Sequence, residues 1–478
     1  MRLRPFLRYG LATAAGWLSF VGAAQARLVT EEIQRAIDAK SAAGGGTVTL
    51  SAGTYEVGSL WLKDNVTLRL ARGATLLGST NYLDYVSFAT VAPHVKERLI
   101  KPGAQSGLRQ MRAVVSACNV TNVALVGEGK IDGRGWFAYD IGQRNASPNR
   151  WRNVAFFRCR DVRVEGVTLV NAASWTLFFR ECRGVVARGL HIDAHANFNN
   201  DGIDIDACDV LIEDCTVDSD DDAICLKSHN PDFVVENVEV RNCRVASNCN
   251  HLKLGTAGYG GFRNVRIHDC TLVPCRVSKF RFWPEQRRKS QKGTVPDSVA
   301  ARLTDPISSH AGIALECVDG GRLENVRISS VDMSAGGVQV PVFVRLARRN
   351  VHPDGQPATL RDVVIENVRG RSVSTVASSI TGVPGLRPTN IVLRNIDLRP
   401  KAGGKLADLP DRLPEVERSY PEADVFRSIL PAYGFYVRHC DGVRFENVRL
   451  SPDGEGEERP PIVTEDCTCV EQEGVCVR

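Results

Sequence analysis

A short pattern that returns along the chain constrains its fold more than any other feature. In each copy, Asn, Asp or Gly precedes an alternation of apolar and polar residues, as in residues 161–167 (DVRVEGV) and 264–270 (NVRIHDC). Alternation with a period of two is typical of short β-strands. The first apolar residues of five successive copies lie 23 to 28 residues apart: Val162, Val185, Val210, Val238 and Val265.

This spacing predicts a solenoid in which each copy forms one coil. Three strands and three turns need a segment of about this length, and a single coil cannot bury its apolar face alone. We therefore predict an all-β fold, a right-handed parallel β-helix. A β-propeller is the alternative, but its blades need about 40–50 residues. Asn and Asp suit the turns because both tolerate the left-handed backbone conformation.

The ends of the chain and the wider spacings complete the predicted organisation. Thr30 is followed by two glutamates and by Ile33 and Ile37, which indicates a short capped amphipathic helix closing the N-terminal end of the solenoid. Wider spacings between copies predict loop insertions near 280–310, a segment rich in Arg and Lys, and near 399–433. We expect a single β-helix domain over residues 27–478.

Residues 1–26 are predicted to be a secretory signal peptide. Three arginines within the first eight residues precede an apolar stretch at 11–21, and an A-x-A site follows at 24–26. A membrane anchor is the alternative, which the small residues of this segment disfavour. We expect an exported protein, periplasmic or extracellular, with no membrane span after cleavage.

Composition narrows the possible partners. The chain is 43% hydrophobic and 24% charged, which excludes wholesale disorder. Its net charge of +5 falls to 5 − 3 = +2 when the three N-terminal arginines are removed. Such a balance of charges does not indicate nucleic-acid binding. We expect a monomer with no nucleic-acid partner.

Most of the 15 cysteines are predicted to be buried, with one local disulfide expected among Cys467, Cys469 and Cys476.

Stacking the coils in register makes aligned residues neighbours, about 4.8 Å apart. Apolar pairs such as Ile203 and Ile205 align as inward positions, and polar residues form one column at a bend and two outward columns within the strand. The bend column holds Trp175, Asp201, Asp222 and Asn250, with Asn200 and Asp221 one residue earlier, and the outward columns hold Phe178, Asp204, Cys225, Lys253 and Ala314, and Arg180, Asp206, Lys227, Gly255, Glu316 and Arg345.

The bend column places Asp201 over Asp222, with Asp221 and Asp204 close by. Like charges at this distance raise the pKa of one carboxyl group. A neutral acid beside an ionised carboxylate suits cleavage of a glycosidic bond, because one group protonates the leaving oxygen and the other activates water or attacks. Two aromatic residues could stack on the face of an acidic sugar: Trp175 and Phe178. Three basic residues could pair with its carboxylate: Lys227, Lys253 and Arg345.

These features also have structural interpretations. Asp220-Asp221-Asp222 could be a solvated turn or part of a calcium site. Lys227, Asp206 and Glu316 could form a surface charge ladder. His251 could be an ordinary surface histidine. The spacing alone leaves these interpretations open beside catalysis.

The segments around the aspartates resemble known motifs. Asn200–Asp204 (NDGID) and Asp221–Ser228 (DDAICLKS) resemble the N-x-D and D-D motifs of glycoside hydrolase family 28, the polygalacturonases. Gly312–Gly321 and Ser379–Gly385 are similar to a bacterial branch of that family. The resemblance runs from about residue 29 to 465.

The resemblance implies hydrolysis of α-linked galacturonic acid in pectin, with inversion and with neither metal nor cofactor. It implies that Asp221 is the general acid and that Asp201 and Asp222 hold and deprotonate the attacking water; Asp220 and Asp221 are the alternative pair. The expected partner is an acidic polysaccharide or oligosaccharide. Expected substrate-binding residues are Asn200, Asp204, Lys227, Asn250, His251, Lys253, Glu316, Arg345 and Trp175.

Two positions depart from the family pattern. The family's G-H-G histidine aligns with Asn250, which leaves His251 one position further on. Its R-I-K segment, which grips the galacturonate carboxylate, reads Ala314-Leu315-Glu316, and the acid would repel that group. A basic residue of a neighbouring column could supply the charge, or the terminal sugar could be rhamnose or neutral. A β-helical polysaccharide lyase or uronate epimerase, and a non-catalytic carbohydrate-binding solenoid, are the alternative functions.

Overall fold

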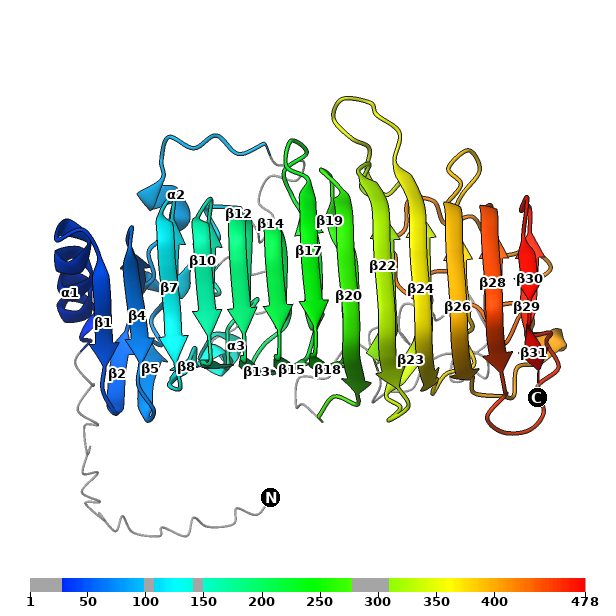
Figure 1. Ribbon diagram of the computed structural model, residues 1–478, viewed down its shortest axis with the longest axis horizontal. Coiled ribbons are helices and arrows are strands. Elements are labelled where there is room, and N and C mark those ends of the chain that lie inside the picture. The colour runs from blue at the N-terminus through cyan, green and yellow to red at the C-terminus, as the bar shows by residue number, and fades with distance from the viewer. Residues whose placement is uncertain (1–27, 99–106, 141–148, 277–308, 478) are drawn as a thin grey trace, which may run out of the picture.

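The computed structural model describes residues 28–98, 107–140, 149–276 and 309–477. Within them the strands form a long stack of coils, and the pairings between named strands are parallel. Figure 1 shows the coils following one another from α1 at one end to β30 at the other. The predicted parallel β-helix is confirmed. The predicted signal peptide and nearly all of the insertion near 280–310 lie outside the described residues.

Each coil contributes strands to three faces of the solenoid. The first face contains β1 (Gly46–Leu50), β4 (Val66–Leu70), β7 (Thr121–Gly127), β10 (Arg160–Glu165), β17 (Val235–Arg241) and β30 (Glu471–Glu473). The second contains β2 (Gly53–Val57), β5 (Ala74–Gly78), β8 (Lys130–Asp132), β11 (Thr168–Val170), β13 (His191–Ala194), β15 (Thr216–Ser219), β18 (Arg244–Ser247) and β31 (Cys476–Val477).

The third face contains β3 (Leu60–Leu62), β6 (Ala113–Cys118), β9 (Arg152–Phe157), β16 (Ile224–Ser228), β19 (Asn250–Gly258), β21 (Ser309–Cys317), β23 (Val338–Leu346), β25 (Ser378–Thr381), β27 (Phe435–Arg438) and β29 (Ile462–Glu465). Longer strands continue from one face to the next. They are β12 (Leu177–Arg188), β14 (Ile203–Glu213), β20 (Phe262–Val273), β22 (Arg322–Met333), β24 (Thr359–Arg371), β26 (Thr389–Arg399) and β28 (Asp441–Leu450).

A continuous apolar core fills the solenoid along its length. The predicted inward pairs belong to it: Ile203 and Ile205 are buried and pair in register with Ile224 and Leu226 of the next coil. The polar residues that alternate with them therefore point away from the core on the third face. This alternation determines which side chains of neighbouring coils can contact one another on the outer surface of the solenoid.

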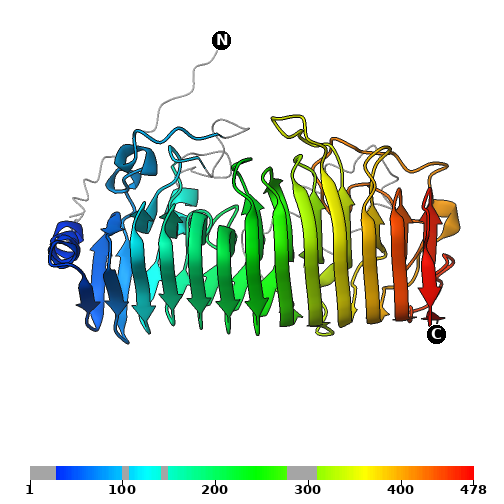
Figure 2. The ribbon, with the colours of Figure 1, turned by 45° about the horizontal axis from the view of Figure 1, so that its top comes forward.

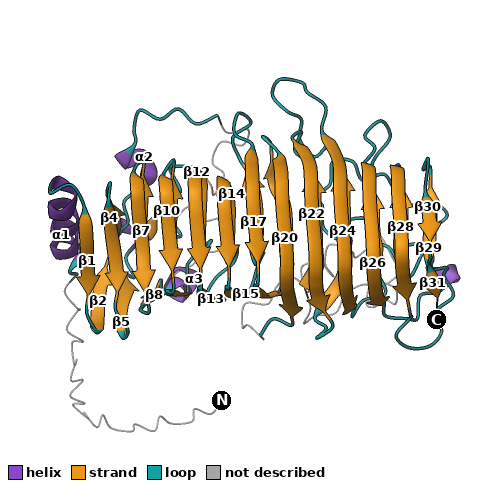
Figure 3. Cartoon of the chain, viewed as in Figure 1, coloured by secondary structure: helices purple, strands orange, loops and turns teal. Residues whose placement is uncertain are grey.

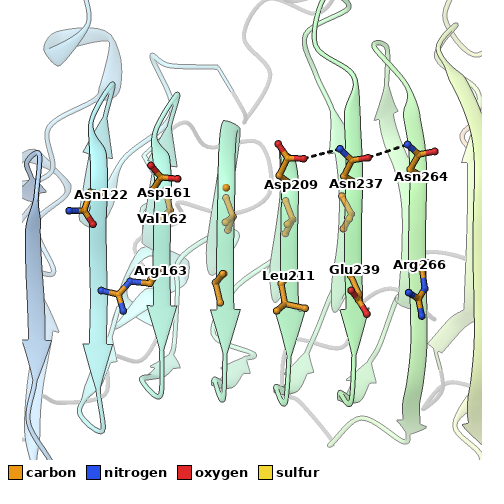
Figure 4. Close-up of a pocket in the computed structure, with 15 residues that line it drawn as sticks. Asn122, Asp161, Val162, Arg163, Asp209, Leu211, Asn237, Glu239, Asn264 and Arg266 are labelled. Carbon is orange, nitrogen blue, oxygen red and sulfur yellow. Dashed lines mark hydrogen bonds between the residues drawn. The ribbon is translucent and has the colours of Figure 1, made fainter.

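The turns before the first face depend on Asn and Asp in the left-handed conformation, as predicted. Asp209, Asn237 and Asn264 have φ angles of 57°, 56° and 56°. Their side chains form a ladder in which Asn237 Nδ2 donates to Asp209 Oδ1 at 2.8 Å and Asn264 Nδ2 donates to Asn237 Oδ1 at 3.1 Å (Figure 4). This ladder borders a groove on the first face that is also lined by Arg163, Glu239 and Arg266 (Figure 4).

The predicted N-terminal helix is α1 (Thr30–Ala42), which packs Ile33 and Ile37 against the first coil. Its capping was wrongly predicted. Val29 is the N-cap residue and makes no side-chain capping bond, because Thr30 Oγ1 instead accepts a hydrogen bond from Gly58 N at 2.9 Å. Figure 2 shows α1 lying against the end of the stack.

The remaining helices are short and lie in connections between strands (Figure 3). They are α2 (Phe88–Val91), α3 (Gly135–Asp140) and the single-turn 3₁₀ helices η1 (Tyr82–Asp84) and η2 (Leu406–Asp408). The connection that holds η2 runs from the end of β26 to the start of β27, where the second insertion was expected. No helix among the described residues has the length and apolar character to cross a membrane.

The predicted disulfide is absent, since every cysteine lies in the described residues and all of them are free. Cys467 sits at a turn, where its thiol faces the carbonyl oxygen of Val437 at 3.6 Å. Cys476 begins β31 on the second face, so the two belong to different corners of the last coil. The expectation that most other cysteines are buried is confirmed.

Candidate active site

Backbone hydrogen bonds between successive bends build the predicted bend column on the third face. Thr176 N donates to Asp201 O at 2.8 Å, Gly202 N to Asp222 O at 2.9 Å, and Ala223 N to Asn250 O at 2.9 Å. The Asp221 carbonyl oxygen accepts hydrogen bonds from the hydroxyl groups of Ser219 and Ser247, which fix the bend that carries the paired aspartates. Residues far apart in the chain are thereby held side by side.

The outward column is also confirmed by the strand register. Phe178 pairs with Asp204, Asp204 with Cys225, Cys225 with Lys253, and Lys253 with Ala314. In the second outward column, Arg180 pairs with Asp206 and Glu316 with Arg345. The predicted stacking therefore brings a lysine from one coil beside carboxyl groups from its neighbours.

Lys227 lies at the centre of the aspartate cluster. Its Nζ is 3.2 Å from Asp201 Oδ2, 3.2 Å from Asp204 Oδ1 and 3.9 Å from Asp222 Oδ2. All four side chains are buried. An ion pair at this depth is screened far less by solvent than a pair on the surface, so Lys227 strongly favours ionised carboxylates around it.

Lys253 makes a second bridge on the other side of Asp222. Its Nζ is 3.1 Å from Asp222 Oδ2 and 3.4 Å from Glu316 Oε2. Asn250 Nδ2 also donates to Asp222 Oδ1 at 2.7 Å. Burial alone would raise the pKa of Asp222, but Lys253 and Lys227, with the hydrogen bond from Asn250, outweigh it and hold that pKa below its ordinary value.

Asp221 differs from its neighbour in having no such partner. Among the described residues no Lys or Arg nitrogen lies within 4 Å of its carboxyl group, which accepts hydrogen bonds from Asn199 Nδ2 at 3.2 Å and Asp222 N at 2.9 Å. Burial raises the pKa of Asp221 well above its ordinary value, and the charges of Asp201 and Asp222 raise it further. The two adjacent aspartates thus favour opposite protonation states.

The pKa values of the two other carboxyl groups around Lys227 are raised in spite of that lysine. Burial is the largest cause of the raised pKa of Asp201; Lys227 opposes it and Asp222 adds to it. Burial likewise raises the pKa of Asp204 well above the ordinary value. At both carboxyl groups, burial thus opposes the effect of Lys227.

Glu316 occupies the position at which the family pattern has a lysine. Burial raises its pKa to about 8, although Lys253 opposes the shift. A carboxyl group in this state repels an acidic sugar less than a free carboxylate would. The lysine of the preceding coil, Lys253, lies 3.4 Å from Glu316 and brings positive charge close to this position.

Three expected substrate-binding residues are held by the protein itself. The Asn200 amide donates to the carbonyl oxygens of Ala172 and Ser174, at 2.8 and 2.9 Å, and thereby anchors the bend. The Arg345 guanidinium donates to Thr381 Oγ1 at 3.2 Å and to the carbonyl oxygens of Gly382 and Glu415, at 3.1 and 2.6 Å. Trp175 is buried beneath Lys227, whose Nζ is 4.8 Å from the ring centre.

The interpretation of His251 as a surface histidine is wrong. Its ring is buried, with Nε2 3.0 Å from Val273 O and Nδ1 3.4 Å from Ala311 O. Both ring nitrogens face backbone carbonyl oxygens, and the nitrogen that carries the proton donates to one of them. It is Asn250 that contacts Asp222.

Sequence reasoning missed several residues that border the cluster. Arg150, in the connection before β9, donates to Asn199 Oδ1 at 3.2 Å, and its charge acts on Asp201 and Asp221. Tyr420, from the connection before β27, is half exposed; its hydroxyl lies 3.2 Å from Thr256 Oγ1 and its ring centre 5.7 Å from Lys253 Nζ. Extending the stack one coil further leads to Arg152, which aligns with Trp175 two residues after Arg150, whereas no pattern marks Tyr420.

Comparison with known proteins agrees with this geometry. Residues 98–277, which carry the aspartate motifs, match the family described as Glycosyl hydrolases family 28. The predicted resemblance of the chain to family 28 polygalacturonases is thus confirmed. A probable polygalacturonase of Vitis vinifera is 26% identical over 243 residues, 48% of this chain and 48% of the relative.

An exo-poly-α-D-galacturonosidase of Dickeya chrysanthemi is 40% identical over 110 residues, 23% of this chain and 17% of that protein. The chain thus spans about half the length, or less, of these two relatives. Among solved structures, the family 28 exopolygalacturonase of Yersinia enterocolitica matches with a TM-score of 0.65 at 17% identity, over 93% of this chain and 75% of that one. At this identity the likeness shows a shared fold.

Proposed function

We propose that this protein is an inverting glycoside hydrolase that cleaves pectic polysaccharides or oligosaccharides at α-linked galacturonic acid or at rhamnogalacturonan-type linkages. The observation that carries the proposal is the contrast between two adjacent aspartates. Asp222 is bound by two lysines, and Asp221 by none among the described residues. The carboxyl group of Asp222 is thus suited to act as a base and that of Asp221 as an acid. The family 28 relatives are named as a polygalacturonase and an exo-poly-α-D-galacturonosidase, which supports an acidic pectic substrate.

In this mechanism Asp221 donates its proton to the glycosidic oxygen as the bond to the anomeric carbon breaks. Asp222, with Asp201, holds a water molecule on the opposite face of the sugar, and Asp222 accepts its proton as the water oxygen bonds to that carbon. Asp221 ends ionised and Asp222 protonated, and a proton exchange with solvent restores both. The product has the inverted configuration because the water attacks opposite to the leaving group.

Lys227 and Lys253 are also suited to bind the carboxylate of the sugar. Lys227 and Lys253 point into the cluster from successive coils, and each contacts more than one carboxyl group. A sugar carboxylate could take the place of one of these contacts when Asp204 or Glu316 is protonated. Tyr420 supplies an exposed aromatic face next to Lys253 on which a sugar ring can stack.

The calcium interpretation of Asp220-Asp221-Asp222 is disfavoured by charge. Lys253 Nζ lies 3.1 Å from the Asp222 carboxylate, where it would repel a calcium ion bound to the same oxygen atoms. The lysine ammonium groups occupy the space that a cation would need.

Export is also part of the proposal. Cleavage after Ala26 would release a mature protein into the periplasm or the medium.

A substrate screen tests the proposal. The purified protein is incubated with homogalacturonan, rhamnogalacturonan and their oligomers, and new reducing ends, product masses and the anomeric configuration of the first product are recorded. We expect saturated products, one new reducing end for each cleavage, and inverted configuration by proton NMR. An unsaturated, ultraviolet-absorbing product would instead show a lyase, and binding without turnover on every substrate would show a non-catalytic solenoid.

A further inference from the structure

A second cluster of side chains with metal-ligand chemistry lies on the second face, outside the candidate active site. His195 follows β13, Asp218 lies on β15, and Cys275 comes two residues after β20. His195 Nε2 is 2.8 Å from Asp218 Oδ1 and 4.0 Å from Cys275 Sγ. The three ligand atoms lie within 4.8 Å of one another, although the residues span 80 positions of the chain.

The distances fit one ion bound among these three atoms. Zn²⁺ binds imidazole nitrogen and carboxylate oxygen at about 2.0–2.2 Å and thiolate sulfur at about 2.3 Å, in tetrahedral geometry. Ligand atoms around such an ion lie about 3.3–3.7 Å apart by this geometry, so small side-chain rotations suffice. His195 and Cys275 are buried, whereas the Asp218 side chain is 27% exposed and leaves a path of entry from solvent.

Asp220 provides the outer support that metal-binding histidines require. Its Oδ1 is 3.7 Å from His195 Nδ1, the ring nitrogen that faces away from Asp218. His195 Nδ1 and Asp220 Oδ2 are buried atoms with no hydrogen-bond partner among the described residues. A carboxylate that accepts from the second ring nitrogen orients the imidazole and makes it a better ligand.

We propose that His195, Asp218 and Cys275 form a site for a divalent transition-metal ion of the Zn²⁺ class, with water as the fourth ligand. The thiolate and the carboxylate neutralise the double charge of the ion in a largely buried place. Soft sulfur with imidazole nitrogen selects zinc-type ions over calcium or magnesium, which prefer oxygen ligands alone. The bound ion would tie three coils together next to the bend that carries Asp221.

The other grouping of ligand atoms, Asp221, Asp222 and Cys249, does not compete for this ion. Lys253 and Lys227 lie 3.1 and 3.9 Å from the Asp222 carboxylate and repel a cation there. The Asp218 carboxylate instead contacts the imidazole that would become a ligand. Charge therefore distinguishes the two groupings.

Titration of the reduced, purified protein with Co²⁺, a coloured substitute for Zn²⁺, tests the site. We expect one equivalent to bind with a thiolate-to-cobalt charge-transfer band and the visible bands of tetrahedral cobalt, and Zn²⁺ to displace it. C275S should remove the charge-transfer band. D220N should weaken binding by about 10- to 100-fold while leaving the bands in place, because it acts through His195.

C249S is the matched control, since it removes a buried cysteine of the second grouping and should leave the cobalt spectrum unchanged. Persistence of the charge-transfer band in C275S, its loss in C249S, or its absence from the unaltered protein would each overturn the proposal. Should C275S fail to fold, D218N, at the partly exposed ligand, gives a second test. It should abolish the rise in melting temperature that Zn²⁺ causes, and a rise equal to that of the unaltered protein would equally reject the site.

Discussion

Two lysines decide which of the buried carboxyl groups around Asp221 carries a proton. Lys227 and Lys253 both contact Asp222, while Asp221 is held by the Asn199 amide and by a backbone N–H. Adjacent residues of the same type thus acquire different acidities, because Lys227 of their own coil and Lys253 of the next coil contact only one of them. This difference provides an acid and a base within one short bend.

Asn250, which stands where the family pattern has histidine, helps to keep Asp222 ionised. In N250A the hydrogen bond to Asp222 Oδ1 is lost, so the pKa of Asp222 rises. The base must be ionised for turnover, and activity is lost as pH falls through that pKa. We therefore expect the acidic limb of the kcat/KM profile to move to higher pH and the alkaline limb, set by Asp221, to stay in place.

The matched control is N264A, which removes an exposed amide of the first-face ladder. Its pH profile should equal that of the unaltered protein. An unshifted acidic limb in N250A would show that this amide does not set the acidity of Asp222.

At the residue scale, the sequence predicts which site residues lie next to one another in the stack, but it does not predict the contacts of every side chain. Asp201, Asp222 and Asn250 were placed correctly because register follows from the alternation of buried and exposed residues. The burial of His251 and the inward bonding of Arg345 were missed. His251 lies against carbonyl oxygens of β20 and β21, a side-chain contact that the alternation does not specify. Arg345 donates to Glu415 of the connection before β27, whose path no periodicity specifies.

At the scale of the elements, one turn type repeats along the solenoid. Asn237 lies between Asp209 and Asn264 in the side-chain ladder and has a φ of 56°. The left-handed conformation costs a residue with a Cβ atom about 1–2 kcal/mol, which Asn offsets by local hydrogen bonds and Gly avoids. The sequence therefore predicts both the turn and the residues that can occupy it.

Replacement of Asn237 separates these two contributions. N237A loses the ladder bonds and keeps the backbone strain, so we expect a lower melting temperature that corresponds to about 1–2 kcal/mol. N237G loses the same bonds without the strain and should be destabilised less. Calorimetry on both variants makes the comparison, and equal or reversed melting temperatures would contradict the role assigned to the left-handed turn.

The elements that were predicted less well are those that do not repeat. The α1 helix was expected from its apolar spacing, but Thr30 bonds to Gly58 of the first coil and not to its own helix. Tyr420 reaches Lys253 from a connection that contains only the short helix η2. Contacts of this kind depend on the three-dimensional path of one segment, and a single sequence carries no second copy with which to compare it.

For the whole molecule, stability depends on closing the ends of the solenoid, because an open end exposes apolar residues. Ile37 of α1 is fully buried against the first coil. I37A should destabilise the protein by about 2–5 kcal/mol, as measured by thermal unfolding, while leaving the kcat of the folded protein unchanged. A36S, on the exposed side of the same helix, should change stability by less than about 0.5 kcal/mol. A similar loss in both variants would mean that the packing of Ile37 is not what closes this end.

The central claim concerns the whole stack: superposed coils bring Asp201 to Asp222 and leave the neighbouring Asp221 as the acid. Turnover of a galacturonic acid oligomer by D221N, in a protein with native circular dichroism and unaltered substrate binding, tests it most directly. An amide cannot protonate the leaving oxygen, so kcat should fall by about 100- to 10,000-fold. A kcat within a few-fold of that of the unaltered protein would contradict the account.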